Sequence, residues 1–268
     1  MKIDFIRVFG FEPSFHGMRN PMDSWHDADS QFYGISGRQC WEGDFGLVRT
    51  PESPVIGPKD LELACKLIRR GSEHRKFLRQ IMVWVRLNVP RFVWQEVDTY
   101  KVATTRMSCS TMNKLGSCDL DQIDFECPIP HTALENVNAL GKVLREAKAE
   151  RAGSDNIRAA RVQLKNDLPE GFLQAAMYTM SYETALTMLL QRENHRLPQW
   201  RLTDQGSICQ FLMSLPYMPQ FYKAATFKRD QLREAKKMLK GLSSQLGDGL
   251  TIEKEDLDNV LELLARAS

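Results

Sequence analysis

The stretch FLRQIMVWVRLNV, residues 77–89, decides the fold. Its second half alternates aliphatic residues with Gln80, Arg86 and Asn88, which fall on the opposite face. The aliphatic positions are Ile81, Val83, Val85, Leu87 and Val89. A period of two is typical of a β-strand with one buried face. Pro90 then ends the strand and opens a short helix in RFVWQEVDTYK.

Other elements follow from similar patterns on both sides. Met1–Phe9 alternates like a strand, whereas residues 10–57, rich in Gly, Pro, Ser and Asp, are expected to be irregular but ordered. From Pro58 an apolar stripe predicts a helix that stops at Gly71. Further helices are expected at about 132–151 and 156–166, then, after a break at Leu168-Pro169, a longer one through Tyr182–Arg192, and another at 199–214.

The tail, residues 230–267, carries two helical patterns separated by Gly247-Asp248-Gly249. The two apolar stripes are Leu232, Ala235, Leu239 and Leu242, and Leu257, Val260, Leu261 and Leu264. A helical hairpin that packs on the body or on another subunit is the expected structure. We therefore divide the chain into a domain at 1–225 and a C-terminal helical appendage at 226–268.

Composition restricts the class of protein. Hydrophobic residues at 43% and charged residues at 26% are ordinary for a globular domain. No apolar run approaches the ~20 residues of a membrane-spanning helix, and the opening residues do not resemble a signal peptide, so a cytoplasmic location is expected. The net charge of +2 does not indicate a nucleic-acid partner.

The six cysteines are scattered without a C-x-x-C pair, which indicates reduced thiols rather than a disulfide framework. Cys109, Cys118, Cys127 and His131 do not have a common zinc-ligand spacing. We therefore expect no metal site.

Two segments carry candidate chemistry. DTYKVATTRMSCSTMNK, residues 98–114, interleaves hydroxyl side chains with cations, as a phosphate cradle does, although an ordinary Ser/Thr-rich turn explains the same composition. LLQRENHRLPQWR, residues 189–201, ends an apolar helix with Arg192, His195 and Trp200 close together. A guanidinium suits the carbonyl edge of a pyrimidine and an aromatic ring stacks on it; cations that favour the helix dipole are the alternative.

The order of segments over residues 58–201 resembles the flavin-dependent thymidylate synthases, which methylate dUMP with methylene-tetrahydrofolate and reduced FAD. KLIRRGSEHRKF is similar to the family's helix that ends in Gly before a His and a Phe, and VPRFVW to its Pro and aromatic helix. Lys165 before Leu168-Pro169, followed by Arg192, His195, Gln199 and Trp200, is similar to a later block, with one residue inserted.

The family signature Arg-His-Arg, seven residues, Ser, one residue, Arg is largely replaced. Its register here holds Thr99-Tyr100-Lys101, then Cys109 and Thr111. Lys76, Lys101 and Arg106 are the available substitutes for the lost phosphate-binding arginines.

The resemblance implies an α+β fold, with helices packed around a twisted mixed or antiparallel sheet, and a homotetramer that binds FAD and nucleotide at subunit junctions. It implies that Arg192 is the catalytic residue and donates to the pyrimidine carbonyl. The remaining substrate-binding positions would be Glu96, Ser108, Cys109, Ser110 and, from a neighbouring subunit, Lys165. The cofactor-binding positions would be His74, Lys76, Thr99, Tyr100, Lys101, Ser181, Thr187 and His195.

The expected reaction is methylation of dUMP to dTMP, with methylene-tetrahydrofolate and NADPH as co-substrates. Where the family commonly has Gln, this chain has Glu96, a carboxylate that accepts from an exocyclic amine, so a dCMP-modifying relative is one alternative. A catalytically silent nucleotide-binding relative is a second. A nucleic-acid-binding protein that uses residues 104–114 and the basic tail helix is a third, against which the balanced charge counts.

Overall fold

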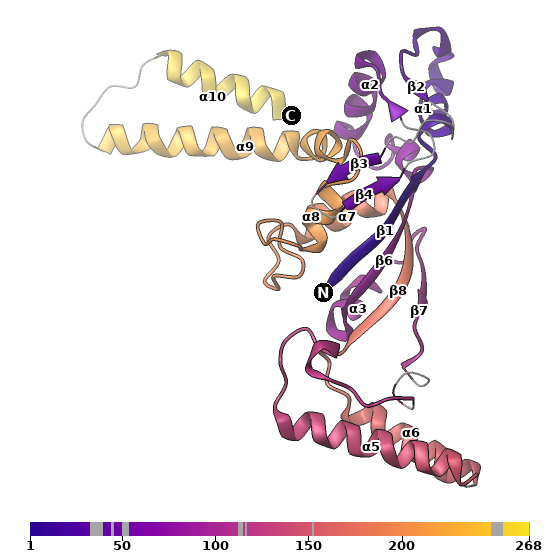
Figure 1. Ribbon diagram of the computed structural model, residues 1–268. Coiled ribbons are helices and arrows are strands. Elements are labelled where there is room, and N and C mark those ends of the chain that lie inside the picture. The colour runs from indigo at the N-terminus through magenta and orange to yellow at the C-terminus, as the bar shows by residue number, and fades with distance from the viewer. Residues whose placement is uncertain are drawn as a thin grey trace.

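The fold is built around a mixed sheet, as a computed structural model shows (Figure 1). It describes residues 1–32, 40–43, 46–49, 54–111, 115, 117–151, 153–247 and 254–267. The strands lie in the order β3-β4-β1-β6-β8-β7. Their bounds are β1 Lys2–Phe9, β3 Cys40–Gly43, β4 Gly46–Arg49, β6 Met82–Pro90, β7 Thr105–Ser108 and β8 Leu173–Ser181. Only the β1–β4 pairing is parallel among these neighbours. A small second sheet pairs β2, Gln31–Phe32, with β5, Pro54–Val55.

The central strand β6 confirms the prediction from its alternation. Val83, Val85 and Val89 are completely buried, and Leu87 nearly so, whereas Arg86 is exposed. The strand pairs on one side with β1 and on the other with β8, both antiparallel. The aliphatic face of β6 therefore forms one side of the main hydrophobic core.

Helices from distant parts of the chain cover this face. They are α1 Phe11–Arg19, α2 Pro58–Arg69, α3 Arg91–Val97, α7 Tyr182–Arg192, α8 Ile208–Met213 and α9 Met218–Gly247. The described residues also contain four short 3-10 helices, namely η1 Asn20–Met22, η2 Trp25–Asp27, η3 Lys76–Arg79 and η4 Gln122–Asp124. On α3, Trp94 donates to the carbonyl of Gln174 on β8 at 2.8 Å and its ring meets Tyr178 edge-on. The predicted strand at Met1–Phe9 and the predicted helices at 58–70 and after Pro90 are confirmed.

Two helical hairpins extend from this body. The first, α5 His131–Ala149 with α6 Ser154–Asp167, confirms two predicted helices and has its own small core, which includes Leu144, Leu164 and Phe172. It lies beyond one end of the sheet in Figure 1. The second hairpin pairs the distal part of α9 with α10, Lys254–Ala267, as predicted. Of its predicted stripes, Ala235 and Val260 are buried; the side chain of Leu242 lies outside the described residues.

Two predictions, the irregular segment after residue 10 and the helix at 199–214, are wrong in part, and strand β8 was not predicted. Residues 11–19 form α1, because Phe11, Phe15 and Met18 bury one helical face despite Pro13 and Gly17. Gly10 permits the turn before this helix: its φ is +96°, and an added Cβ would lie 2.3 Å from the carbonyl oxygen of Gln80.

The helix expected through Tyr182–Arg192 is confirmed as α7, but the strand that precedes it was not predicted. Leu173–Ser181 is rich in helix-forming residues, but it is held as β8 between β6 and β7. Burial alternates along it at Ala176, Tyr178 and Met180. The helix expected at 199–214 contains only Ile208–Met213, because Gly206 has φ +77° and Ser207 caps the helix.

The expected fold class, an α+β fold with a mixed, mainly antiparallel sheet and packed helices, is confirmed. Within the described ranges, no helix combines the length and apolar character needed to cross a bilayer.

A buried ion pair ties the N-terminal segment to α2. Arg19 Nε donates to Asp60 Oδ1 at 2.6 Å, and both side chains are at most 5% exposed. The other carboxylate oxygen accepts from the amide and hydroxyl of Ser30 at 2.9 and 2.5 Å. Burial alone would raise the pKa of Asp60, but the hydrogen bonds from Ser30 and Arg19 outweigh it, so the pKa is lowered.

We expect Asp60→Asn to lower the free energy of unfolding by about 3–5 kcal/mol at neutral pH, because it leaves Arg19 charged and buried without a carboxylate. Since the folded-state pKa of Asp60 is depressed, its contribution is present above the unfolded pKa and is lost as the pH falls through the folded pKa. Urea unfolding at pH 7 and at pH 3 measures both effects. Equal stability of the two proteins at pH 7 would contradict the role of the pair.

Candidate functional site

The candidate site is a group of five side chains, which we call the Arg192 cluster. It consists of Glu96 near the end of α3, Tyr100 just beyond it, Arg192 at the end of α7, and His195 and Trp200 in the segment that follows. Local structure fixes that segment. Trp200 N–H donates to the carbonyl of Leu197, and Ile208 N–H donates to that of Gln199. The chain therefore turns tightly after α7, and Trp200 packs against the guanidinium of Arg192.

Arg192 is held on three sides. Its Nη1 lies 2.9 Å from Glu96 Oε2, and its Nε donates to the Tyr100 hydroxyl at 3.2 Å. Its guanidinium carbon lies 5.2 Å from the centre of the Trp200 ring. The side chain is 19% exposed, so it is screened from bulk water without being sealed from it. Among the contacts of the described residues, Nη2 makes no hydrogen bond and is the nitrogen positioned to donate to a ligand.

His195 meets Arg192 and Glu96 through Nε2. Nε2 lies 2.8 Å from Arg192 Nη1 and 3.6 Å from Glu96 Oε2. A guanidinium only donates, so Nε2 accepts from Arg192, and the proton of a neutral ring is then on Nδ1, 3.2 Å from the backbone nitrogen of Leu197. The cluster thus presents a carboxylate acceptor beside one donor, the guanidinium of Arg192.

The cluster rests on a rigid base. Trp200 is completely buried and meets His195 and Tyr100 with ring centroids 6.5 Å apart in each case. Glu193, next to Arg192, accepts from Tyr222 and Arg229 on α9. The end of α7 is therefore clamped to the long C-terminal helix, and the position of Arg192 depends on it.

A second polar pocket lies at the end of β7. Its cavity of about 250 Å³ is lined by Arg86, Asn88, Cys109, Thr111, Phe172, Leu173, Gln174 and Ala175. Cys109 N–H donates to the carbonyl of Ala175 at 2.8 Å, and Gln174 donates to the carbonyl of Cys109 at 2.8 Å. Of the predicted phosphate residues, Ser108, Cys109 and Ser110 are exposed here. Within the segment 98–114, which was expected to be a cradle or a turn, Thr105–Ser108 forms the edge strand β7.

Arg86 is the cation that sequence reasoning missed in this pocket. It projects from the face of β6 opposite the core, in register with Asp4 on β1 and Met177 on β8. The signal was present, because Arg86 alternates with buried aliphatic residues in the stretch at 77–89. The sequence could not show that Arg86 is able to contact an anion, because that depends on the pairing that places β8, and β7 beyond it, next to β6.

The remaining predicted cofactor residues fall into different places. Thr99 and Lys101 are exposed beside Tyr100, and the Thr99 hydroxyl donates to the carbonyl of Glu96. Ser181 is buried as the cap of α7, where its hydroxyl accepts from the amide of Thr184. Thr187 donates to the carbonyl of Glu183 one turn back. The Ser181 and Thr187 hydroxyls are therefore already used within α7.

His74 and Lys76 are exposed and lie at the other end of α7. The intervening Arg75 pairs with Glu183 in the first turn of that helix at 2.9 Å, whereas Arg192 is in the last turn, ~14 Å along the axis. Both residues border a cavity of about 610 Å³ between α1 and α2. Within one chain, the predicted flavin neighbours His74 and His195 are thus not brought together.

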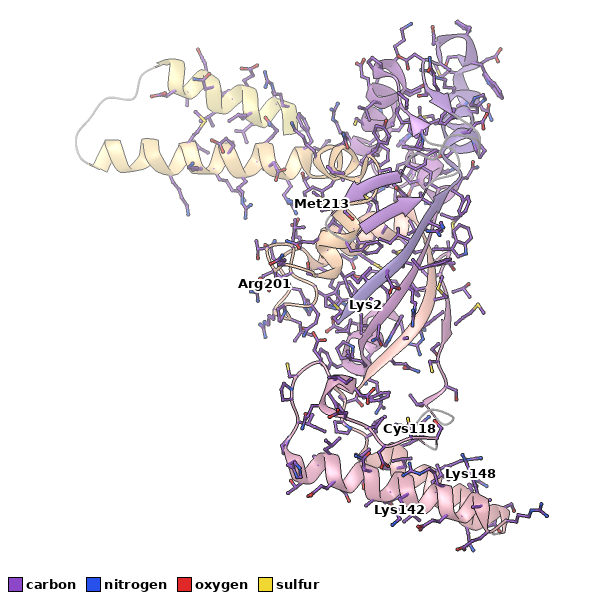
Figure 2. All side chains as sticks on the ribbon, in the orientation of Figure 1. Lys2, Cys118, Lys142, Lys148, Arg201 and Met213 are labelled. Carbon is purple, nitrogen blue, oxygen red and sulfur yellow. The ribbon has the colours of Figure 1, made fainter. Side chains whose placement is uncertain are left out.

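Lys165 is exposed on α6 and is separate from the Arg192 cluster. In Figure 2, Lys142 and Lys148 mark the α5–α6 hairpin beyond one end of the sheet. Arg201 marks the segment between α7 and α8, which lies beside the sheet and away from that hairpin. A contact between Lys165 and a ligand at Arg192 therefore requires a second copy of the chain.

Solved structures with a similar fold carry these ligands. A thymidylate synthase X from Helicobacter pylori with FAD and dUMP matches at a TM-score of 0.55 and 14% identity, over 84% of this chain and 99% of that one. A flavin-dependent thymidylate synthase from Helicobacter pylori, complexed with FAD and dUMP, matches at 0.53 and 14%, over 83% and 97%. No family profile and no curated protein sequence matches this chain. The likeness establishes the fold of a flavin-dependent thymidylate synthase.

We expect Cys209, on α8 behind the cluster, to be unreactive in the native protein. Burial raises the pKa of its thiol to about 12, and the charge of Glu193 acts in the same direction. At pH 8, Ellman's reagent should label the exposed Cys109, Cys118 and Cys127 quickly, and Cys209 only after denaturation. Cys109→Ser should remove one fast thiol, and Cys209→Ala none. Fast labelling of Cys209, located by peptide mass spectrometry, would contradict the packing behind Arg192.

Proposed function

We propose that this protein methylates C5 of dUMP to give dTMP, with FAD as cofactor and methylene-tetrahydrofolate and NADPH as co-substrates, as a cytoplasmic homotetramer. The observation that carries the proposal is the Arg192 cluster, on a fold that also occurs in thymidylate synthases bound to FAD and dUMP. A guanidinium held in plane by Glu96 and Tyr100 is oriented before the ligand arrives. Its orientation therefore requires no rearrangement during the reaction.

The arrangement of donor and acceptor complements the edge of uracil. Uracil presents a carbonyl oxygen next to N3–H, and the cluster offers the Arg192 guanidinium as donor next to the Glu96 carboxylate as acceptor. Arg192 Nη2 would donate to one carbonyl and stabilise the negative charge of the ring that makes C5 the nucleophile toward the one-carbon unit of the folate; the C5 proton, released as tritium from [5-³H]dUMP, then leaves. Arg86 projects from the sheet face opposite the core, whereas Arg192 lies on the core side. Arg86, Ser108, Ser110 and the backbone around Cys109 would therefore hold the phosphate of a nucleotide whose base lies at Arg192 of another copy, with Lys165 from a neighbouring subunit.

The cofactor-binding residues in this proposal lie in two groups. Tyr100 and His195 supply a hydroxyl and a ring nitrogen to the flavin, and Thr99 and Lys101 beside them face its phosphates. The hydroxyls of Ser181 and Thr187 are engaged within α7, so these two residues would support the helix and not contact the flavin. His74 and Lys76, on another copy of the chain, complete the site. FAD when bound supplies the hydride that converts the transferred carbon into a methyl group.

An open sheet face supports assembly from several copies. Phe9 and Met107 are 37% and 73% exposed, on the face opposite the core. Phe9 meets the half-buried Trp84 edge-on, with centroids 5.2 Å apart. Aromatic residues and Met are enriched at subunit contacts, so this face is where we place the contact between copies.

Arg192→Lys should lower kcat/KM for tritium release from [5-³H]dUMP by about 100-fold or more, because an ammonium cannot keep the planar contacts to Glu96 and Tyr100 while it donates to the base. Arg196→Lys, an exposed arginine four residues on, serves as the matched control and should be within about twofold of wild type. Purified protein should be yellow or take up FAD. Colourless protein that binds dUMP but neither binds FAD nor turns over would establish a silent nucleotide-binding relative instead.

Glu96 supports a second candidate substrate, dCMP. The Glu96 carboxylate, 2.9 Å from Arg192, would accept from the exocyclic amine of cytosine, while the guanidinium would donate to N3 and O2. If dCMP is the substrate, wild type should bind it more tightly than dUMP, and Glu96→Gln should shift the Kd ratio by about tenfold toward dUMP. Glu170→Gln, on the surface, is the control. Isothermal titration with both nucleotides decides; an unchanged ratio eliminates the dCMP alternative.

A further inference from the structure

Several leucines of the α9–α10 hairpin lie outside its small core. Among its described side chains, Ala235 and Val260 are the ones fully buried between the helices. We call the four most exposed of the described leucines the hairpin leucines; they are Leu232 and Leu239 on α9 and Leu257 and Leu261 on α10, exposed by 42%, 42%, 47% and 55%. Several exposed leucines on one hairpin indicate an interaction surface, whereas leucines scattered singly over a surface would not.

The hairpin leucines share one side of the hairpin. At ~100° per residue, Leu232 and Leu239 lie about 40–60° around α9 from the buried Ala235. Leu257 and Leu261 lie about 60–100° around α10 from Val260, in the same rotational sense. The two helices are joined end to end as a hairpin and run antiparallel (Figure 1). An equal rotation on antiparallel helices points to the same side, so the four side chains form one apolar strip.

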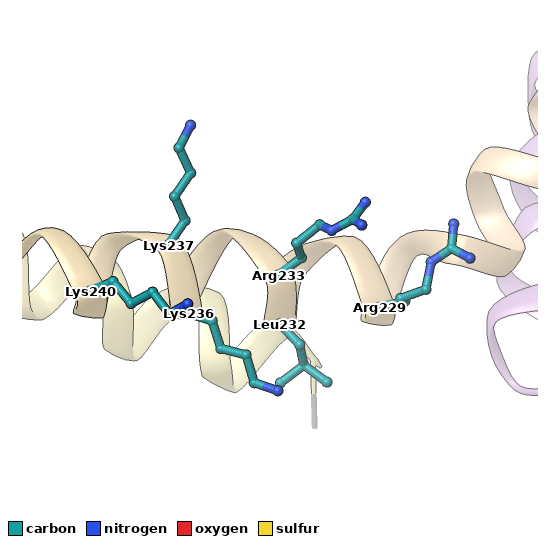
Figure 3. A pocket seen from close by; sticks show the side chains of 6 residues that line it. All are labelled: Arg229, Leu232, Arg233, Lys236, Lys237 and Lys240. Atoms are coloured by element: carbon teal, nitrogen blue, oxygen red, sulfur yellow. The ribbon is translucent and has the colours of Figure 1, made fainter. Parts of the chain in front are cut away.

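Opposite charges flank this strip. On α9, Arg233, Lys236 and Lys240 are exposed and lie about 100–160° from Ala235, next to the leucines. Figure 3 shows Leu232 and Lys236 on the same side of α9, with Lys237 on the opposite side. On α10, the exposed Asp258 and Glu262 lie about 160–200° from Val260. Glu262 also pairs with the exposed Arg266 one turn on. The outer edge of the strip is therefore basic along α9, and along α10 it carries two carboxylates, one of them shared with Arg266.

We infer that the strip is a docking surface for a second copy of this chain, whose own hairpin packs against it to form a four-helix arrangement. A twofold axis parallel to the helices places α10 of the partner beneath α9, and α9 of the partner beneath α10. Each basic edge then faces an acidic edge. A twofold axis across the helices sets basic against basic, so charge selects the first arrangement.

A polyanion, the other partner that the basic edge suits, leaves the hairpin leucines uncovered. Arg233, Lys236 and Lys240 satisfy phosphate contacts without burying Leu257 or Leu261 on α10. A second hairpin buries the leucines of both copies and pairs both charged edges. The inference does not depend on flavin chemistry, because none of these residues belongs to the Arg192 cluster.

Sedimentation velocity of the full-length chain tests the inference through a charge swap. Reversing one edge, by Arg233→Glu with Lys236→Glu or by Asp258→Lys with Glu262→Lys, should weaken association by about tenfold or more. The quadruple variant restores opposite charges across the interface and should recover the wild-type mass. Arg158→Glu with Arg161→Glu, exposed on α6, is the matched control and should leave the mass unchanged.

The apolar part has its own test. Leu239→Ser with Leu261→Ser should reduce association even at about 0.5 M salt, where charge pairs are screened. These leucines are already exposed, so helix content by circular dichroism should stay unchanged. Wild type and all variants having the same mass would overturn the inference. So would weaker retention on heparin of the α9 reversal with no change of mass, which would assign the basic edge to a polyanion.

Discussion

The pairing of β6 with β8 is the constraint on which the site depends. These antiparallel strands share a register from Met82↔Ser181 to Pro90↔Leu173, ~30 Å of sheet. α3 follows β6 at one end of this pair, and α7 follows β8 at the other. The two helices run toward each other over the core face, ~10 and ~16 Å long. Their lengths nearly span the strand pair, so their C-terminal ends meet, and Glu96 meets Arg192.

Because the C-terminal ends of α3 and α7 meet, the Arg192 guanidinium and the Glu96 carboxylate lie together in a half-buried site. The C-terminal ends of both helices carry partial negative charge, which favours a guanidinium and disfavours Glu96. The ion pair offsets that cost, and Trp200 excludes water from one side. Because Tyr100 and Glu96 use Nε and Nη1, the arginine has a single defined direction in which to donate. The pair therefore fixes an orientation more than it adds stability.

The sequence predicts those elements whose apolar period is strong. β6, α2 and the two hairpins have such periods, and their existence is confirmed by the structure. β8 was missed because its Ala, Met and Leu residues favour a helix, and only pairing on both sides makes it a strand. α1 was missed because Pro13 and Gly17 hide a helix that burial of Phe11 and Phe15 stabilises.

The candidate site divides in the same way. The grouping of Arg192, His195 and Trp200 follows from short spacing along one segment, and these residues do meet. The Glu96 contact joins residues 96 positions apart and required the tertiary fold. A structure with FAD and dUMP or dCMP bound tests the central claim most directly. The account predicts the Arg192 guanidinium at ~3 Å from a pyrimidine carbonyl oxygen, with the base against the flavin. A pyrimidine bound away from Arg192 in every subunit would contradict it.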